Sequence, residues 1–140
     1  FIGGGAGMAP ILCLLRSLVE RGISRKATYY YGARRRQDLC FEKELRALEE
    51  RLPGFRYVPA LSESTDGDGW EGEVGFITDV VRRQVRGLAD VDAYVCGPPP
   101  MVEAAIELLS DLGVPEKRIY YDKFTTTGEP DSAPAIGRAS

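Results

Sequence analysis

A chain of 140 residues, of which 44% are hydrophobic and 28% charged, is long enough for one soluble domain and too short for two of ordinary size. A net charge of −3 gives no net attraction to nucleic acid or anionic lipid, and no apolar run is long enough to anchor the chain in a membrane. The absence of histidine and the wide spacing of Cys13, Cys40 and Cys96 exclude histidine relays, zinc sites and iron–sulfur sites, and favour a reducing, cytoplasmic compartment.

The first predicted elements are a short strand end, a helix and a strand. The chain starts with two apolar residues that run directly into glycines, without an initiator methionine, so we interpret it as a piece of a longer protein. Apolar residues spaced three and four apart predict a helix from Met8 to about Gly22. The aromatic and β-branched residues of 26–31 predict a strand that stops at Gly32.

The middle of the chain continues this alternation. Apolar residues on one helical face predict a helix over 39–52, which a proline and a glycine terminate. Residues 55–60 predict a short strand, and Pro59 indicates that this strand lies at an edge of the sheet. The segment 62–73 has the composition of a loop.

The carboxyl-terminal part contains further alternating elements and a polar end. Residues 76–85 predict a helix that is either capped by Thr78 or begun slightly earlier. The next elements are a buried parallel strand over 92–96, the clearest helix over 101–112 and a short strand over 119–121. Residues 125–140 have too few apolar side chains to order themselves, so we expect one domain over 1–124 followed by a flexible tail.

Strand and helix alternate along the whole ordered chain, and no internal repeat is visible. This pattern predicts an α/β domain in which helices cover both faces of a parallel sheet, a three-layer, doubly wound arrangement. In such sheets the ligand binds outside the carboxyl ends of the strands, where the winding direction reverses. The turns that follow the strands are therefore the candidate functional segments.

The first such turn, residues 3–10, has four glycines in its first five positions. Glycine allows positive φ and close approach of an anion, and the following helix offers free N–H groups, so a pyrophosphate is the expected ligand. The strict dinucleotide fingerprint is not met, because the turn ends in Pro10, and the lysine of a phosphate-binding P-loop is absent. The alternative is a tight turn without a ligand.

The second turn, residues 32–38, follows the strand that is expected beside the first. Asp38 is our candidate for binding the hydroxyls of an adenosine ribose. Three consecutive arginines, 34–36, are also what a ribose phosphate would require. The alternative is a solvated basic loop in which Asp38 caps the next helix, and we favour this reading for Arg35 and Arg36.

The third turn, residues 96–101, is the most informative of the three. Three prolines stiffen the connection from strand to helix, and Gly97 leaves space for a flat ring. Cys96 has no base to activate it, so we interpret it as a compact neighbour of an aromatic ring and not as a nucleophile. The alternative is a thiol that is simply buried in the core.

Together these turns resemble the nicotinamide-binding domain of the ferredoxin–NADP reductase family. The matching motifs are the glycine-rich turn ending in Pro10, Tyr31-Gly32-Ala33-Arg34 with Asp38-Leu39, Cys96-Gly97-Pro98-Pro99-Pro100-Met101, and the closing segment Tyr121-Asp122-Lys123-Phe124. The resemblance covers residues 1 to about 124 and is greatest to the reductase component of soluble di-iron monooxygenases of the propane, methane or phenol hydroxylase type.

This resemblance implies five parallel strands in the order 3-2-1-4-5. It also implies a parent chain with an FAD domain and a two-iron two-sulfur ferredoxin domain ahead of Phe1, and an oxygenase as the final electron acceptor. The isolated piece is then expected to be inactive. NADH is preferred over NADPH in this interpretation, because Asp38 would repel a ribose phosphate.

The resemblance also assigns roles to residues. The pyrophosphate maps onto Gly4, Gly5, Gly7 and the neighbouring Met8; the adenosine ribose onto Arg34, Asp38 and, more weakly, Ser62; the nicotinamide onto Cys96, Gly97, Pro98 and Met101. Phe124 resembles the aromatic residue that covers the flavin until the nicotinamide displaces it, although it could simply pack at a strand end. The tail beyond Phe124 departs from the usual pattern of the family.

Two other functions are compatible with the residues themselves. A stand-alone regulatory module would bind the dinucleotide without transferring electrons. A flavodoxin-like carrier would bind FMN itself and would be yellow when purified.

Overall fold

A computed structural model describes the chain except for residues 6–7, 24, 66, 89, 125–136 and 139–140. The strands are β1 (Ile2–Gly4), β2 (Ala27–Ala33), β3 (Phe55–Leu61), β4 (Glu73–Val74), β5 (Ala93–Gly97), β6 (Ile119–Lys123) and β7 (Gly137–Arg138). The helices are α1 (Met8–Glu20), α2 (Glu42–Arg51), α3 (Ile77–Gln84) and α4 (Pro99–Asp111), with 3₁₀ turns at Arg36–Asp38 and Glu116–Arg118.

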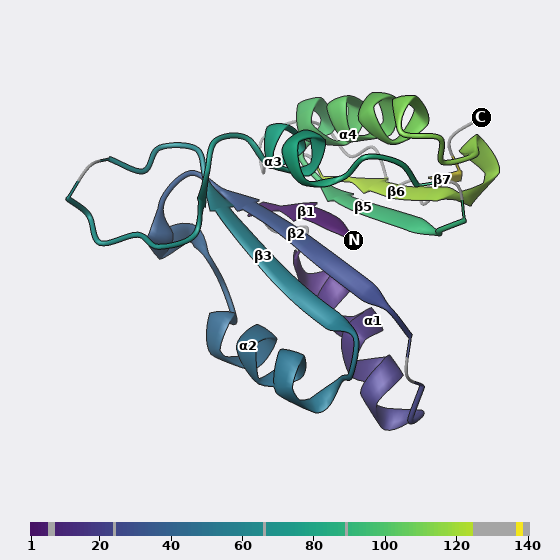
Figure 1. Cartoon of the computed structure of the whole chain (residues 1–140), viewed down its shortest axis with the longest axis horizontal. Helices are drawn as coiled ribbons and strands as arrows, with labels where there is room; N and C mark the ends of the chain where they lie inside the picture. Colours follow the sequence, from purple (N-terminus) through teal and green to yellow (C-terminus); the bar gives the residue numbers. More distant parts are fainter. Residues whose placement is uncertain (6–7, 24, 66, 89, 125–136, 139–140) are drawn as a thin grey trace.

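The strands form one sheet in the order β4-β3-β2-β1-β5-β6-β7. All neighbouring pairs are parallel except β6 and β7. The predicted order 3-2-1-4-5 is confirmed by β3-β2-β1-β5-β6, and one short strand is added at each edge. Helices α1 and α2 cover one face of the sheet while α3 and α4 cover the other, which gives the predicted three layers (Figure 1).

Several predicted boundaries differ from the observed ones. The expected loop over 62–73 ends in β4, which pairs with the last residues of β3. Of the two predicted starts of α3, the earlier one is confirmed, because the helix begins at Ile77 and Thr78 lies inside it and does not cap it. Helix α2 starts three residues later than predicted, since Phe41 adopts a left-handed conformation (φ 56°) just before it. The predicted flexible tail lies outside the described residues apart from β7, which pairs with Tyr120 and Tyr121.

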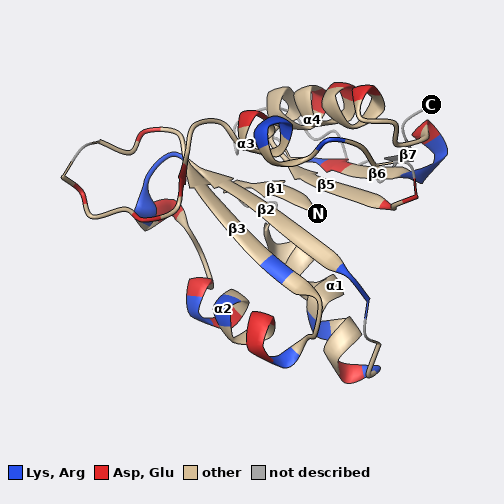
Figure 2. Ribbon diagram, viewed as in Figure 1, with Lys and Arg blue, Asp and Glu red and all other residues tan. Residues whose placement is uncertain are grey.

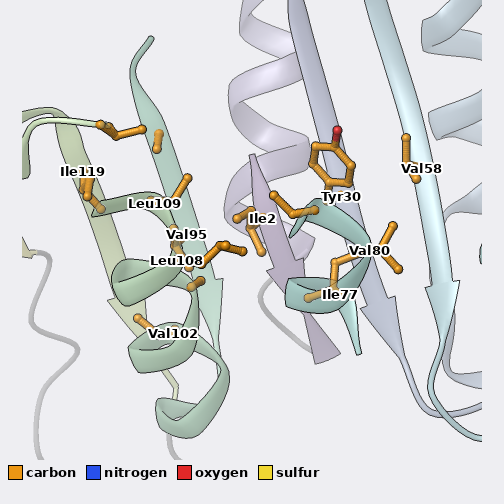
Figure 3. Close-up of a cluster of buried hydrophobic side chains, with 14 of the residues drawn as sticks. Ile2, Tyr30, Val58, Ile77, Val80, Val95, Val102, Leu108, Leu109 and Ile119 are labelled. Carbon is orange, nitrogen blue, oxygen red and sulfur yellow. The ribbon is translucent and has the colours of Figure 1, made fainter. Parts of the chain in front are cut away.

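The face beneath α3 and α4 contains the larger apolar cluster, which Figure 3 shows in close-up. Ile2 and Val95 from the central strands are buried against Val80 of α3 and Leu108 of α4. Full burial of each aliphatic side chain contributes about 1.5–3 kcal/mol relative to exposure. This cluster therefore fixes both helices against the sheet and places the turns that precede them.

The opposite face, beneath α1 and α2, is built around three tyrosines. The Tyr29 and Tyr31 rings stack with their centroids 5.4 Å apart, and Tyr57 lies 6.1 Å from Tyr29. The Tyr31 hydroxyl accepts a hydrogen bond from the backbone N–H of Cys40 (3.2 Å) and donates to the carbonyl of Asp38 (3.5 Å). The Tyr29 hydroxyl is buried and has no partner among the described residues.

This difference predicts opposite effects of two matched substitutions. Tyr29→Phe removes an unpaired buried hydroxyl, so we expect the free energy of unfolding to stay level or rise by about 1 kcal/mol. Tyr31→Phe removes a paired hydroxyl and leaves the N–H of Cys40 without its acceptor, which is expected to cost about 1–3 kcal/mol. Urea unfolding of the two variants measures both changes in the free energy of unfolding. An equal loss in both variants would contradict the finding that, of these two hydroxyls, only that of Tyr31 has hydrogen-bond partners among the described residues.

The outer edge of β3 has no free backbone donor. The N–H of Phe55 donates to the carbonyl of Leu52 (3.1 Å), and that of Tyr57 donates to the carboxylate of Glu49 on α2 (3.2 Å). Pro59 has no N–H, and beyond it β4 pairs with the strand. The expectation that Pro59 indicates an edge is thus explained: over 55–59, β3 has a neighbouring strand on one side only.

Candidate functional site

Three glycines lie side by side at the carboxyl ends of the three central strands. Gly4 of β1 pairs with Gly32 of β2, and Gly97 of β5 flanks Gly4 on the other side. A Cβ at Gly97 would lie 3.2 Å from the Gly4 carbonyl oxygen and 2.6 Å from the methyl carbon of Met101. Met101 of α4 therefore occupies the space that the sequence analysis expected a flat ring to use.

The glycine-rich turn continues from this row of glycines into α1. Gly5 is exposed, has a φ of +56°, and has no atom within 4 Å of the position of a Cβ. Gly7 lies outside the described residues. Met8 begins α1 and its side chain is buried, so only its backbone N–H can face a ligand. The first turn of a helix has unpaired N–H groups and the positive end of the helix dipole, and this combination suits a pyrophosphate.

The loops after β2 and β3 are joined by backbone hydrogen bonds. The N–H of Ser62 donates to the carbonyl of Ala33, and that of Glu63 to the carbonyl of Arg34, both at 2.9 Å. Ser62 and Arg34, which the sequence analysis assigned to the adenosine ribose, therefore come from adjoining loops at the same edge of the sheet.

Asp38 belongs to the loop after β2 as well. Its Oδ2 accepts from the backbone N–H of Arg35 at 3.2 Å, so it closes the 3₁₀ turn Arg36–Asp38 and does not cap α2. No described residue donates to Oδ1 of Asp38, and the residue is exposed. This oxygen is available to the hydroxyls of a ribose. Figure 2 shows the basic residues after β2 and the acidic residues of the neighbouring loop near this edge.

Cys96 and Phe124 lie on the α1 side of the sheet. Cys96 is 7% exposed and belongs to the apolar cluster against which the half-buried Phe124 packs. The backbone N–H of Phe124 donates to the carbonyl of Gly97 at 2.9 Å, which continues the pairing of β5 with β6 and fixes the Phe124 backbone beside the turn. Pro98, the residue before α4, is exposed at the same corner.

The surroundings of Cys96 keep its thiol protonated. Burial raises the pKa of Cys96 to about 11, and the negative charge of Asp122, its register partner on β6, acts in the same direction. The thiolate is the reactive form, so at neutral pH Cys96 is an apolar contact and not a nucleophile. Both readings made from the sequence, a contact with an aromatic ring and a thiol simply buried in the core, fit an unreactive Cys96.

Chemical labelling tests this property. We expect iodoacetamide at pH 8 to modify the exposed Cys13 and Cys40 first, and Cys96 only after urea unfolds the chain. Because the pKa of Cys96 is raised, its labelling in the folded protein should accelerate as the pH approaches 11. Peptide mass spectrometry measures the three rates, and labelling of Cys96 as fast as Cys13 at pH 8 would contradict this account.

Two further residues at this edge were missed by the sequence analysis. Asp122 has a buried carboxylate oxygen, Oδ1, without a hydrogen-bond partner among the described residues. Phe76 was assigned to the apolar face of a helix, but it precedes α3 and is 69% exposed. The sequence pattern that could have indicated Asp122 is a carboxylate two residues before Phe124 in an aromatic strand. No sequence pattern distinguishes Phe76 from its apolar neighbours.

The position of Phe76 follows from its neighbours. The N–H of Gly75, which has a φ of +117°, donates to the carbonyl of Leu61 at the end of β3 (2.9 Å). Ile77, on the other side, packs over Gly32, where its Cβ lies 2.9 Å from the position of a Cβ. Phe76 is therefore exposed near the carboxyl ends of β2 and β3, where it can stack on a planar base.

The residues at this edge fit a nicotinamide dinucleotide. A glycine turn with a helix N-terminus, a loop with a free carboxylate oxygen, and a corner of apolar and proline residues follow three neighbouring strands, β1, β2 and β5. This order matches a pyrophosphate in the middle, a ribose on one side and a nicotinamide on the other. Within the described residues, no helix is long and apolar enough to span a membrane, and no group of three potential metal-binding side chains occurs.

Comparisons with known proteins indicate the same class of ligand. The family model described as an oxidoreductase NAD-binding domain matches residues 1–107. The reductase component of propane 2-monooxygenase from Rhodococcus jostii is 49% identical over 90% of this chain, which covers 35% of that protein. The reductase component of phenol 2-monooxygenase from Pseudomonas sp. is 37% identical over 92% of the chain, which covers 37% of it.

Solved structures show the same similarity. A cytochrome P450 reductase from Amycolatopsis has a TM-score of 0.80 and 35% identity, over 89% of this chain and 37% of the other. The ferredoxin reductase of carbazole 1,9a-dioxygenase has a TM-score of 0.76 and 33% identity, over 89% of this chain and 36% of the other. The chain thus spans little more than a third of the length of these proteins.

Proposed function

Because the chain belongs to the oxidoreductase NAD-binding domain family, we propose that it is the part of a flavin-dependent reductase that binds NADH and directs the nicotinamide toward FAD. The observation that carries this proposal is the convergence of the turns after β1, β2 and β5 at one edge of the sheet, in the order that a dinucleotide requires. FAD and, in the relatives that are monooxygenase components, the later electron carriers would belong to other parts of the parent protein.

In this proposal the adenosine half binds over the ends of β2 and β3. Oδ1 of Asp38 accepts from the ribose hydroxyls, with Arg34 and Ser62 at the same rim, and the exposed ring of Phe76 stacks on the adenine. The pyrophosphate lies on Gly4, Gly5 and the N-terminus of α1.

The nicotinamide half binds at the corner formed by the turn after β5 and the end of β6. Cys96 and Phe124 hold the ring by contact, with Gly97, Pro98 and Met101 as the wall on the side of α4. The buried Oδ1 of Asp122 has no donor among the described residues, and a polar hydrogen of the bound ring would supply one. NADH supplies a hydride to the flavin, and the protein contributes the binding and the orientation.

The proposal extends to the partners of the parent protein. An FAD domain and a two-iron two-sulfur ferredoxin domain in the same chain would pass electrons to an oxygenase component. The names of the propane, phenol and xylene or toluene monooxygenase relatives support this direction. A cytoplasmic location fits the free thiols Cys13, Cys40 and Cys96. The same relatives favour this function over a stand-alone regulatory module or an FMN carrier.

Binding of NADH to the chain itself tests the proposal. We expect the purified protein to be colourless, to bind NADH in a fluorescence titration, and to reduce no added dye, because the flavin site lies elsewhere. A yellow protein that retains FMN, or a chain that does not bind NADH, would overturn the proposal.

Two matched glycine variants locate the binding edge. Gly5 and Gly22 have similar positive φ angles, +56° and +64°, and neither has an atom within 4 Å of a Cβ position. An alanine at either position therefore has the same backbone strain, on the order of 1–2 kcal/mol. Gly22 follows the far end of α1, away from the candidate site. We expect Gly5→Ala to weaken NADH binding and Gly22→Ala to leave it unchanged.

A further inference from the structure

Arg35 is held by carboxylates on two sides. Its Nε lies 3.2 Å from Oε2 of Glu63, and its backbone N–H donates to Oδ2 of Asp38, also at 3.2 Å. The carboxylates come from different loops, one after β3 and one after β2. Arg35, the middle one of the three consecutive arginines, is therefore already paired with a carboxylate at the rim of the adenosine ribose site.

The position of Glu63 relative to Arg35 is set by the backbone. Hydrogen bonds from the N–H of Ser62 to Ala33 and from the N–H of Glu63 to Arg34 extend the pairing of β2 and β3 into the loops. The ion pair thus joins two segments that are aligned before any ligand binds. Both side chains are exposed, 64% for Arg35 and 48% for Glu63, so the pair contributes little to folding but can be reached by a ligand.

We propose that Glu63, through its ion pair with Arg35, makes this site select a dinucleotide with a free ribose 2′-hydroxyl over one with a 2′-phosphate. This inference rests on the proposed function, because it names the form of the coenzyme that the same site accepts. A guanidinium is the preferred partner of a phosphate. Glu63 occupies that guanidinium and adds a second negative charge beside Asp38.

The cost of a 2′-phosphate at this rim has two parts. Its charge of nearly −2 would face the carboxylates of both Asp38 and Glu63. It would also have to displace Glu63 from Arg35 before that guanidinium could give it a charge-assisted hydrogen bond. A ribose hydroxyl meets neither obstacle, since it donates to a carboxylate and needs no cation. Glu63 is therefore a specificity-determining residue, although it touches no reacting atom.

The test compares two fragments that differ only in the 2′-phosphate, 5′-AMP and adenosine 2′,5′-bisphosphate. Their dissociation constants are measured by isothermal titration with the 140-residue chain and with Glu63→Gln. We expect the wild-type chain to bind 5′-AMP at least as tightly as the bisphosphate. In Glu63→Gln the ratio of affinities should shift toward the bisphosphate at least tenfold, which corresponds to about 1.4 kcal/mol.

Two variants separate the ion pair from a general change of charge. Glu71→Gln removes an exposed acidic side chain of the same loop that forms no ion pair among the described residues, and should leave the ratio as in the wild type. Arg35→Gln combined with Glu63→Gln should reduce the shift to the part that comes from loss of the Glu63 charge, because the released guanidinium is then gone. Raising the salt concentration should reduce the shift in Glu63→Gln, as expected for exposed charges.

The possible failures are distinguishable. An unchanged ratio in Glu63→Gln, an equal shift in Glu71→Gln, or a shift of undiminished size without Arg35 would each overturn the role of the Glu63–Arg35 pair while leaving NADH binding intact. A wild-type chain that binds neither 5′-AMP nor NADH would overturn the proposed function, and this inference with it.

Discussion

Replacing Cys96 with alanine is expected to slow the reduction of flavin by NADH on the order of 100-fold in a reductase that contains this domain. The buried thiol forms part of the apolar corner with Phe124, and its loss leaves a gap into which the nicotinamide can shift. A displacement of about 1 Å from the reactive distance is sufficient for such a loss of rate. Because the proposed sites of the adenosine half and the pyrophosphate lie elsewhere, the dissociation constant of NADH should change by no more than about threefold.

Stopped-flow measurement of flavin absorbance gives the rate, and titration gives the affinity. Cys13→Ala is the matched control, since Cys13 is exposed on α1 and belongs to neither apolar cluster. An unchanged rate of flavin reduction in Cys96→Ala would remove Cys96 from the mechanism. A parallel loss of rate and affinity would indicate that the thiol only supports the shape of the whole site.

Replacing Gly32 with alanine is expected to lower the free energy of unfolding by about 1–3 kcal/mol, the usual cost of overpacking a core. The new Cβ would lie 2.9 Å from Cβ and 3.2 Å from Cγ2 of Ile77. These atoms are next to the backbone of α3, so the helix itself must move to relieve the contact. The shift would also displace Phe76, which precedes that helix, so NADH binding should weaken as well.

Gly87→Ala is the control for this substitution. Gly87 has no atom within 4 Å of a Cβ position and no positive φ, so an alanine there meets neither a clash nor backbone strain. Urea unfolding should show a change of less than about 0.5 kcal/mol for Gly87→Ala. Equal stabilities of the two variants would show that α3 does not pack on Gly32 as described.

The layers of this fold could be predicted because their signals are local. Helical spacing and runs of β-branched and aromatic residues locate α1, α4, β2 and β5 to within a few residues. The strands β4 and β7 have two residues each, too few for any periodic pattern, and they exist because longer strands offer a free edge. The late start of α2 depends on the conformation of Phe41, which its apolar side chain does not reveal.

The candidate site was predictable where it lies in turns that follow strands. The contacts that were missed depend on how distant segments are aligned. Glu63 meets Arg35 only because β2 and β3 pair in one particular register. Asp122 reaches Cys96 through the pairing of β5 with β6, and Met101 fills the space over Gly4 and Gly97 from a separate helix. None of these contacts has a signature in the local sequence.

The lack of free N–H donors along the outer edge of β3 affects how the protein associates with itself at high concentration. The edge strands of two sheets can pair only when each supplies both N–H donors and carbonyl acceptors for the backbone hydrogen bonds between them. Here Glu49 and Leu52 take the available hydrogens, and Pro59 carries none. An incoming strand would meet only carbonyl acceptors along this edge of β3, so the edge resists the strand addition that leads to amyloid-like fibrils.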